Sequence, residues 1–68
     1  MTEIPKNAVE TLRIERGAYN GVDLIHVRVW TGRPGDEGAK PTQKGLSLRP
    51  ELWREVLPVV AALLDEGA

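Results

Sequence analysis

The stretch V-D-L-I-H-V-R-V-W, Val22 to Trp30, decides the fold of this chain. Its side chains alternate between two faces of an extended backbone, one with Ile25, Val27 and Val29 and the other with Leu24, His26, Arg28 and Trp30. Period-two alternation with many β-branched residues is typical of a half-buried strand. We therefore predict a long strand here and expect the neighbouring segments to pair with it.

A second alternating segment precedes this strand. T-L-R-I-E-R, Thr11 to Arg16, places Leu12 and Ile14 on one face. The dipeptide Asn20-Gly21 lies between the two segments and readily adopts the positive φ values of a tight turn. The two segments are therefore predicted to form an antiparallel hairpin.

The next segments add to the same sheet. Gly32 to Gly38 is predicted to be a loop, because Gly and Pro interrupt it too often for a regular element. A last strand is predicted over about Lys40 to Leu48. A short edge strand around Ile4 also fits the pattern, although Pro5 disfavours it because proline cannot donate to a neighbouring strand.

Pro50 is predicted to begin a helix that runs to about residue 65. Proline suits the first helical position, and Glu51 favours the positive end of the helix dipole. Pro58 should kink or interrupt the helix, because its ring clashes with the carbonyl of Arg54. The expected fold is α+β, with a curved antiparallel sheet (strands within about residues 11–48) followed by this helix.

Apolar residues cover much of the circumference of the predicted helix. One stripe contains Leu52, Val56, Val59, Val60 and Leu63, and Trp53, Leu57, Ala61 and Leu64 widen it. A helix with so wide an apolar surface has to be covered on more than one side. We therefore expect a homodimer, with an interface that includes Trp53, Val56, Val60 and Leu64.

Length and composition also favour association. The chain has 68 residues, and we expect residues 1–68 to form a single domain. Domains of this size bury only about 60% of their unfolded surface and often need disulfides, metals or oligomerisation. With no Cys and one His, we expect no disulfide, metal or other cofactor.

The sequence predicts an intracellular protein. Residues 1–10 lack the apolar core of a signal peptide, and the longest apolar stretch, Val56 to Leu64, is too short to span a bilayer. The absence of Cys suits a reducing compartment. We expect a cytoplasmic, nucleoid-associated location and no membrane partner.

No catalytic constellation is recognisable. Ser47, the only Ser, lies in a predicted strand without a nucleophile elbow. Asp36 and Glu37 are adjacent on a Gly-rich loop, and that loop lacks the Gly-Lys-Ser/Thr ending of a phosphate-binding loop. We expect no catalytic residues and a protein that is not an enzyme.

Charge is distributed unevenly, although the net charge is only −1. Between Thr11 and Arg49 there are seven basic and four acidic residues, whereas from Pro50 onward there are four acidic residues and one Arg. Such asymmetry can indicate a surface that binds a polyanion. Ordinary solvated charge explains the same counts, so both interpretations stay open.

Binding of single-stranded nucleic acid fits the aromatic residues. Such proteins stack bases on aromatic rings within a positively charged groove. Tyr19 lies beside the predicted hairpin turn, and Trp30 shares a strand face with Arg28 because they are two residues apart. We expect this face to merge with the one that carries Lys40 and Lys44. Packing is the alternative explanation for each aromatic side chain, and for Trp53 on the helix it is the favoured one.

Three segments resemble a known family. K-P-T-Q-K-G-L-S-L-R-P-E-L-W, Lys40 to Trp53, resembles the signature of the transcriptional coactivator "positive cofactor four" family, in which a basic residue, Lys-Gly, a short I/L-S/T-L strand and a Pro-Glu helix start follow in this order. Y-N-G, Tyr19 to Gly21, is similar to the family's hairpin, and I-H-V-R-V-W, Ile25 to Trp30, to its I-D-I-R-E-aromatic strand. The matching segments extend over about residues 11–57. We expect the minimal prokaryotic or phage form.

The resemblance implies a four-stranded antiparallel sheet, a C-terminal helix and a homodimer formed largely through the helices. It also implies binding of single-stranded DNA with little sequence preference, in transcription regulation, replication or repair. The implied nucleic-acid-binding residues are Tyr19, Asn20, Arg28, Trp30, Lys40, Gln43, Lys44 and Gly45. Asn20 and Gln43 stand where relatives often carry Lys or Arg, which bears on affinity more than on fold.

Two alternatives stay open at this point. The chain is compatible with a dimeric protein-interaction module that has lost nucleic-acid binding, and the residues at 20 and 43 together with an acidic pI favour this alternative. RNA is a second alternative ligand, because stacking does not read the 2′-OH. Transcription or replication proteins are further expected partners.

Overall fold

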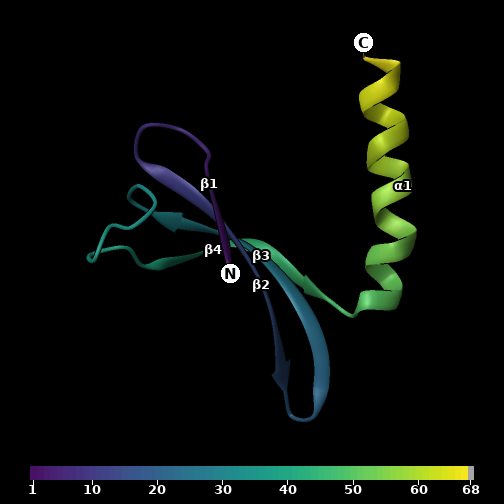
Figure 1. Cartoon of the computed structure of the whole chain (residues 1–68), viewed down its shortest axis with the longest axis horizontal. Helices are drawn as coiled ribbons and strands as arrows, with labels where there is room; N and C mark the ends of the chain where they lie inside the picture. The colour runs from purple at the N-terminus through teal and green to yellow at the C-terminus, as the bar shows by residue number, and fades with distance from the viewer. Residues whose placement is uncertain (68) are drawn as a thin grey trace.

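The computed structural model describes residues 1–67 and contains four strands followed by one helix (Figure 1). The elements are β1 (Thr2–Pro5), β2 (Glu10–Tyr19), β3 (Val22–Thr31), β4 (Pro41–Leu48) and α1 (Pro50–Glu66). All four strands form one antiparallel sheet in the order β1-β2-β3-β4. The predicted α+β fold is therefore confirmed, and the edge strand around Ile4 is present. Pro5 is tolerated because it ends an edge strand.

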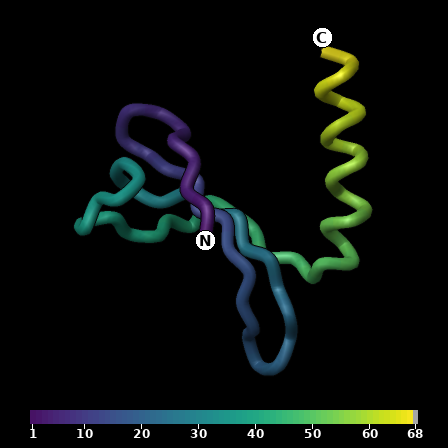
Figure 2. The backbone as a smooth tube through the Cα atoms, in the orientation of Figure 1, coloured from purple at the N-terminus to yellow at the C-terminus, as the bar shows by residue number. Residues whose placement is uncertain are grey.

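The hairpin of β2 and β3 is the longest paired unit. Its register is unbroken over ten residue pairs, from Glu10 opposite Thr31 to Tyr19 opposite Val22. At its tip Asn20 has φ 50° and Gly21 has φ 77°, the positive values that a two-residue hairpin loop requires. Figure 2 shows the hairpin projecting beyond the other strands as a long arm. The sequence prediction for this hairpin is confirmed.

The register divides the sheet into two chemically different faces, because paired residues of antiparallel strands point to the same side. We call one side the apolar face. Its apolar residues are Ile4, Leu12, Ile14, Ile25, Val27, Val29, Leu46 and Leu48, and Glu10 and Arg16 point to the same side. We call the other side the polar face, and its residues include Glu3, Thr11, Arg13, Glu15, His26, Arg28, Trp30 and Ser47.

Little of the apolar face is covered by the chain itself. Within residues 1–67 only Val29 and Thr11 are buried, and Leu46 is 49% exposed. Figure 1 shows α1 standing beside the sheet, with all but its beginning away from the strands. The chain therefore forms one layer of sheet without a second layer of its own across the apolar face.

The start of α1 is attached to the sheet through Trp53. Its indole N–H donates to the carbonyl oxygen of Ile25 at 2.9 Å, next to the place where β4 ends at Leu48. Trp53 and Val56 are half-buried, whereas Leu64 is 72% exposed. This contact fixes the beginning of the helix and leaves most of its apolar side free.

The helix is continuous through Pro58, so of the two predicted effects, a kink or an interruption, the interruption is not found. Proline removes the hydrogen bond to the carbonyl of Arg54, but both residues are exposed, and water can hydrate that carbonyl. Within residues 1–67 no helix has the length and apolar character needed to cross a membrane.

Gly45 allows β4 to approach β3 closely. The register between these strands shifts between Arg28 and Trp30. Gly45 has φ 150°, and a Cβ atom at this position would lie 2.4 Å from the carbonyl oxygen of Val27 and 2.7 Å from the Cα atom of Arg28. Because both neighbours are backbone atoms, they cannot move aside as a flexible side chain would.

The substitution Gly45→Ala should therefore destabilise the sheet. We expect a loss of about 1–3 kcal/mol in the free energy of unfolding, because the methyl group overlaps with backbone. Urea denaturation followed by circular dichroism measures this. Gly38→Ala is the matched control, since its Cβ would make only an ordinary 3.5 Å contact with Asp36, and it should change stability by less than about 0.5 kcal/mol. Equal midpoints for the two variants would contradict the role of Gly45.

Candidate nucleic-acid interface

Two arginines and one aromatic ring gather on the polar face. Arg13 of β2 is paired directly with Arg28 of β3, and Thr11 is paired with Trp30. Two-residue spacing on each strand then brings Arg13 beside Trp30. The guanidinium carbon Cζ of Arg13 lies 3.6 Å from the centroid of the Trp30 ring, which is the geometry of a cation–π contact. Sequence reasoning had not placed Arg13 here.

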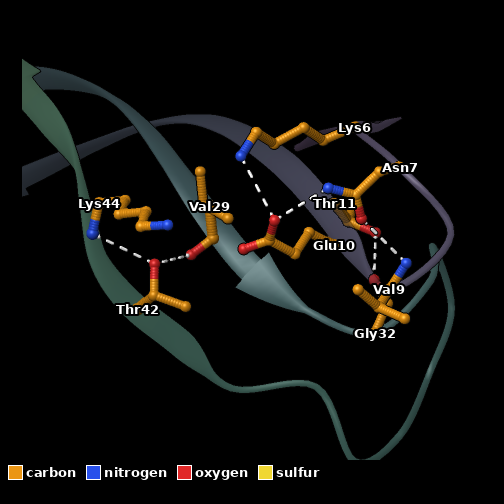
Figure 3. Close-up of polar contacts among 9 residues, drawn as sticks. All are labelled: Lys6, Asn7, Val9, Glu10, Thr11, Val29, Gly32, Thr42 and Lys44. Atoms are coloured by element: carbon orange, nitrogen blue, oxygen red, sulfur yellow. Dashed lines mark hydrogen bonds and ion pairs between the residues drawn. The ribbon is translucent and has the colours of Figure 1, made fainter.

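Arg28 links the polar face to the irregular part of β4. Its Nη1 donates to the carbonyl oxygen of Thr42 at 2.9 Å. The hydroxyl of Thr42 donates to the carbonyl of Val29 at 2.8 Å and accepts the backbone N–H of Lys44 at 3.1 Å (Figure 3). Thr42 therefore fixes the backbone where the register shifts, and Arg28 is held against the same segment.

Lys44 lies on the other side of the sheet. Gly45 is paired with Arg28, so its neighbour Lys44 points to the apolar face. In Figure 3 the side chain of Lys44 extends alongside Val29, on the side of Glu10. The predicted merging of the face of Arg28 and Trp30 with that of Lys44 is therefore not found, because the register places the two sets one residue out of phase.

Glu10 accepts contacts from the β1–β2 turn near Lys44. Its Oε1 accepts a hydrogen bond from Asn7 Nδ2 at 2.9 Å and pairs with Lys6 Nζ at 3.3 Å (Figure 3). The hydrogen bond from Asn7, then that from Lys6, and the positive charges of Lys6 and Lys44 lower the pKa of the Glu10 carboxyl. A carboxylate thus partly balances the cations at this end of the apolar face.

Lys40 and Gln43 are exposed beside or within β4. The backbone N–H of Lys40 donates to the hydroxyl of Thr31 at 3.0 Å, and its carbonyl accepts the N–H of Thr31 at 2.9 Å. Because β4 is the last strand of the sheet, an extended ligand that crosses this edge can reach side chains on both faces.

Tyr19 and Asn20 lie far from this cluster. Tyr19 is 68% exposed at the tip of the hairpin, where it is paired with Val22. Eight residue steps along β3 separate Val22 from Trp30, a length of about 26 Å in an extended strand. Within one chain the structure therefore does not bring Tyr19 and Trp30 together.

An ion pair closes the stem of the hairpin near its tip. Arg16 Nε donates to Asp23 Oδ1 at 3.1 Å, and a second contact joins Arg16 Nη2 to Asp23 Oδ2. This hydrogen-bonded guanidinium lowers the pKa of the Asp23 carboxyl. The charge of Arg16 is thus neutralised by Asp23. The excess of basic over acidic residues between Thr11 and Arg49 therefore does not add positive charge near the hairpin tip.

The remaining polar features are a hydrogen-bonded pair on the sheet and a cleft beside it. His26 Nδ1 lies 2.6 Å from Ser47 Oγ on the polar face. Among residues 1–67, no three His, Cys, Asp or Glu side chains are grouped closely enough to hold a metal ion. A cleft of about 610 Å³ lies between the β1–β2 turn and the β3–β4 loop, and its lining includes Lys6 and Arg33.

The contacts of Glu10 predict a pH effect. Because its folded pKa is lowered, Glu10 stabilises the folded chain above its unfolded pKa, and this contribution is lost as the pH falls through the folded pKa. Asn7→Ala should raise the pKa of Glu10 toward its ordinary value, because the largest cause is removed. An NMR titration of the carboxyl carbons measures this, with Asp23 as the internal control that should not shift. An unchanged Glu10 titration would show that Asn7 does not act on this carboxyl.

Comparison with known proteins gave one match. The family model described as Transcriptional Coactivator p15 (PC4) matches residues 6–58, which is more than half of the chain and includes all of β2, β3 and β4. No curated protein and no solved structure matched the chain.

Proposed function

Because the chain belongs to the Transcriptional Coactivator p15 (PC4) family, we propose that it binds single-stranded DNA with little sequence preference and without a chemical step. The cluster of Arg13, Arg28 and Trp30 on the polar face carries this proposal. It combines an aromatic ring with positive charge, the two groups that hold a single strand. Transcription regulation, replication and repair are the processes in which such binding would act.

The cations around β4 supply the phosphate contacts in this proposal. Arg28 lies on the polar face, Lys40 directly precedes β4, and Lys44 lies on the opposite face. A single DNA strand that crosses the sheet edge at β4 would pass each of these three cationic side chains. Gln43 and Gly45 belong to the same segment, and neither carries a side chain that would keep a phosphate away.

The hairpin tip adds a separate contact. Tyr19 is exposed there beside Asn20, and its ring is free to stack on a base. The tip is about 26 Å along β3 from Trp30. Tyr19 would therefore contact a different part of the same DNA strand, or a DNA strand that is bound by a second subunit. Extended single-stranded DNA suits such separated contacts better than a compact ligand does.

We further propose that the protein acts as a homodimer. Within the described residues only Val29 and Thr11 are buried, which is too little core for a stable domain of this size. Trp53, Val56, Val60 and Leu64 follow one another along the middle of the apolar stripe of α1. A second copy that covers this stripe and the end of the apolar face near Ile25 and Leu48 would supply the missing core, and would leave both polar faces and Lys44 open.

Fluorescence anisotropy of a labelled oligothymidine, compared with duplex of equal length at two salt concentrations, tests the binding function. We expect a preference for the single strand and a salt slope of about −0.7 per phosphate neutralised. Lys44→Ala should weaken binding and make the slope shallower by about 0.7. Arg54→Ala on the polar side of α1 is the control of equal charge change and should leave the slope unchanged. Absence of binding at low salt would instead favour the protein-interaction module.

Sedimentation equilibrium tests the dimer. Val60→Glu places a carboxylate in the middle of the apolar stripe and should abolish the dimer, with loss of folded structure because folding and association are linked at this size. Arg54→Glu introduces the same group on the opposite side of α1 and should leave the dimer intact. A folded monomer of the unaltered protein at micromolar concentration would refute the proposal.

A further inference from the structure

One side of the Trp30 ring is covered by another side chain. The guanidinium of Arg13 lies over it, with Cζ 3.6 Å from the ring centroid. A nucleic-acid base that approaches from this side meets the guanidinium before it meets the indole. The surface offered at this place is therefore a planar cation resting on an aromatic ring.

The positive charge of Arg13 is only partly compensated by its neighbours. Its direct cross-strand neighbour is Arg28, and like charges in this relation destabilise a sheet. Glu3 of β1 compensates only in part, because Oε1 of Glu3 is 3.7 Å from Nη2 of Arg13, beyond the distance of a good hydrogen bond. Glu3 is also shared, since its Oε2 accepts the backbone N–H of Gly35 at 3.2 Å.

The hydrogen-bonding capacity of Arg13 is also unused. Guanidinium carries five N–H donors, yet Nε is buried without a hydrogen-bond partner in the described part of the chain. An unsatisfied buried donor costs free energy, and its presence in a folded protein calls for an explanation. The ring of Trp30 covers Arg13, so the 19% of its side chain that stays exposed belongs to atoms other than Nε.

We propose that Arg13 is a nucleic-acid-contacting residue and that Trp30 is the positioning residue that holds its guanidinium flat on the polar face. This inference rests on the proposed function and names a contact within it. The guanidinium plane stacks on a base, as arginine does in single-stranded recognition, and its terminal N–H groups donate to a neighbouring phosphate. Arg28, held by the Thr42 carbonyl, flanks the same phosphate.

Three variants measured with the labelled oligothymidine separate the roles of plane, charge and packing. Arg13→Met keeps an adaptable side chain that can still pack on the indole ring but removes the charge and the donors. We expect its affinity to fall about 5- to 150-fold, the effect of losing one stacked base, with a salt slope shallower by about 0.7. Arg13→Lys keeps the charge but not the plane, so its affinity should fall with an unchanged slope. Arg54→Met is the control and should bind as the unaltered protein does.

Trp30→Leu tests the positioning role. It should weaken binding in the unaltered protein but have little further effect in the Arg13→Met background, because the ring acts through the guanidinium. Thermal melts by circular dichroism show which variants remain folded, and only those are compared. If Trp30→Leu unfolds, Arg13→Met and Arg13→Lys still test whether the Arg13 guanidinium contacts the nucleic acid.

The outcomes separate this inference from the proposed function. If Arg13→Met binds as tightly as the unaltered protein, the guanidinium does not contact the ligand and the inference is overturned. Additive effects of Arg13→Met and Trp30→Leu would overturn the positioning role. Failure of the unaltered protein to bind oligothymidine at low salt would overturn the proposed function, and this inference with it.

Discussion

The unbroken pairing of β2 with β3 is the constraint on which the rest of the structure depends. Ten residue pairs fix which side chains share a face, and no other pair of elements is joined as extensively. This register sets Arg13 against Arg28 and Thr11 against Trp30. A shift of one residue would send Arg13 to the apolar face and separate it from the ring. The candidate interface is therefore a direct consequence of hairpin register.

The same pairing places the apolar side chains on one side of the sheet and the proposed contacts Arg13, Arg28 and Trp30 on the other. A sheet that is apolar on one side and polar on the other has to bury the first and can leave the second in water. The chain covers little of its apolar face, and α1 stands beside the sheet with its own apolar stripe exposed (Figure 1). Association on that side leaves the polar face of each subunit accessible. In the proposed homodimer, loss of the subunit contact would unfold the sheet, whereas a change confined to the exposed atoms of the polar face would act on the proposed binding.

The sequence predicted what depends on local pattern. Alternation over Val22–Trp30 and the Asn20-Gly21 turn gave the hairpin, and Pro50 gave the start of α1. It did not predict that Lys44 would lie on the apolar face, because alternation within a strand does not reveal how that strand is aligned with its neighbour. The shift near Gly45 sets this alignment. The contact of Arg13 with Trp30 was missed for the same reason, since it also depends on register between two strands.

An acidic protein can bind a polyanion if its charges are separated in space. The four acidic residues beyond Pro50 lie in α1. Glu51 and Glu55 in its first turns share a cleft with Leu24 and Ser47 of the sheet, whereas Asp65 and Glu66 lie at the far end of the helix (Figure 1). At physiological salt, charges separated by more than about 8 Å are largely screened from each other. Asp65 and Glu66 therefore contribute little to the field around Arg13 and Arg28, where Glu3 and Glu15 are the acidic side chains of the polar face. The net charge of −1 is an average over the whole chain, so it does not describe the local field at Arg13 and Arg28.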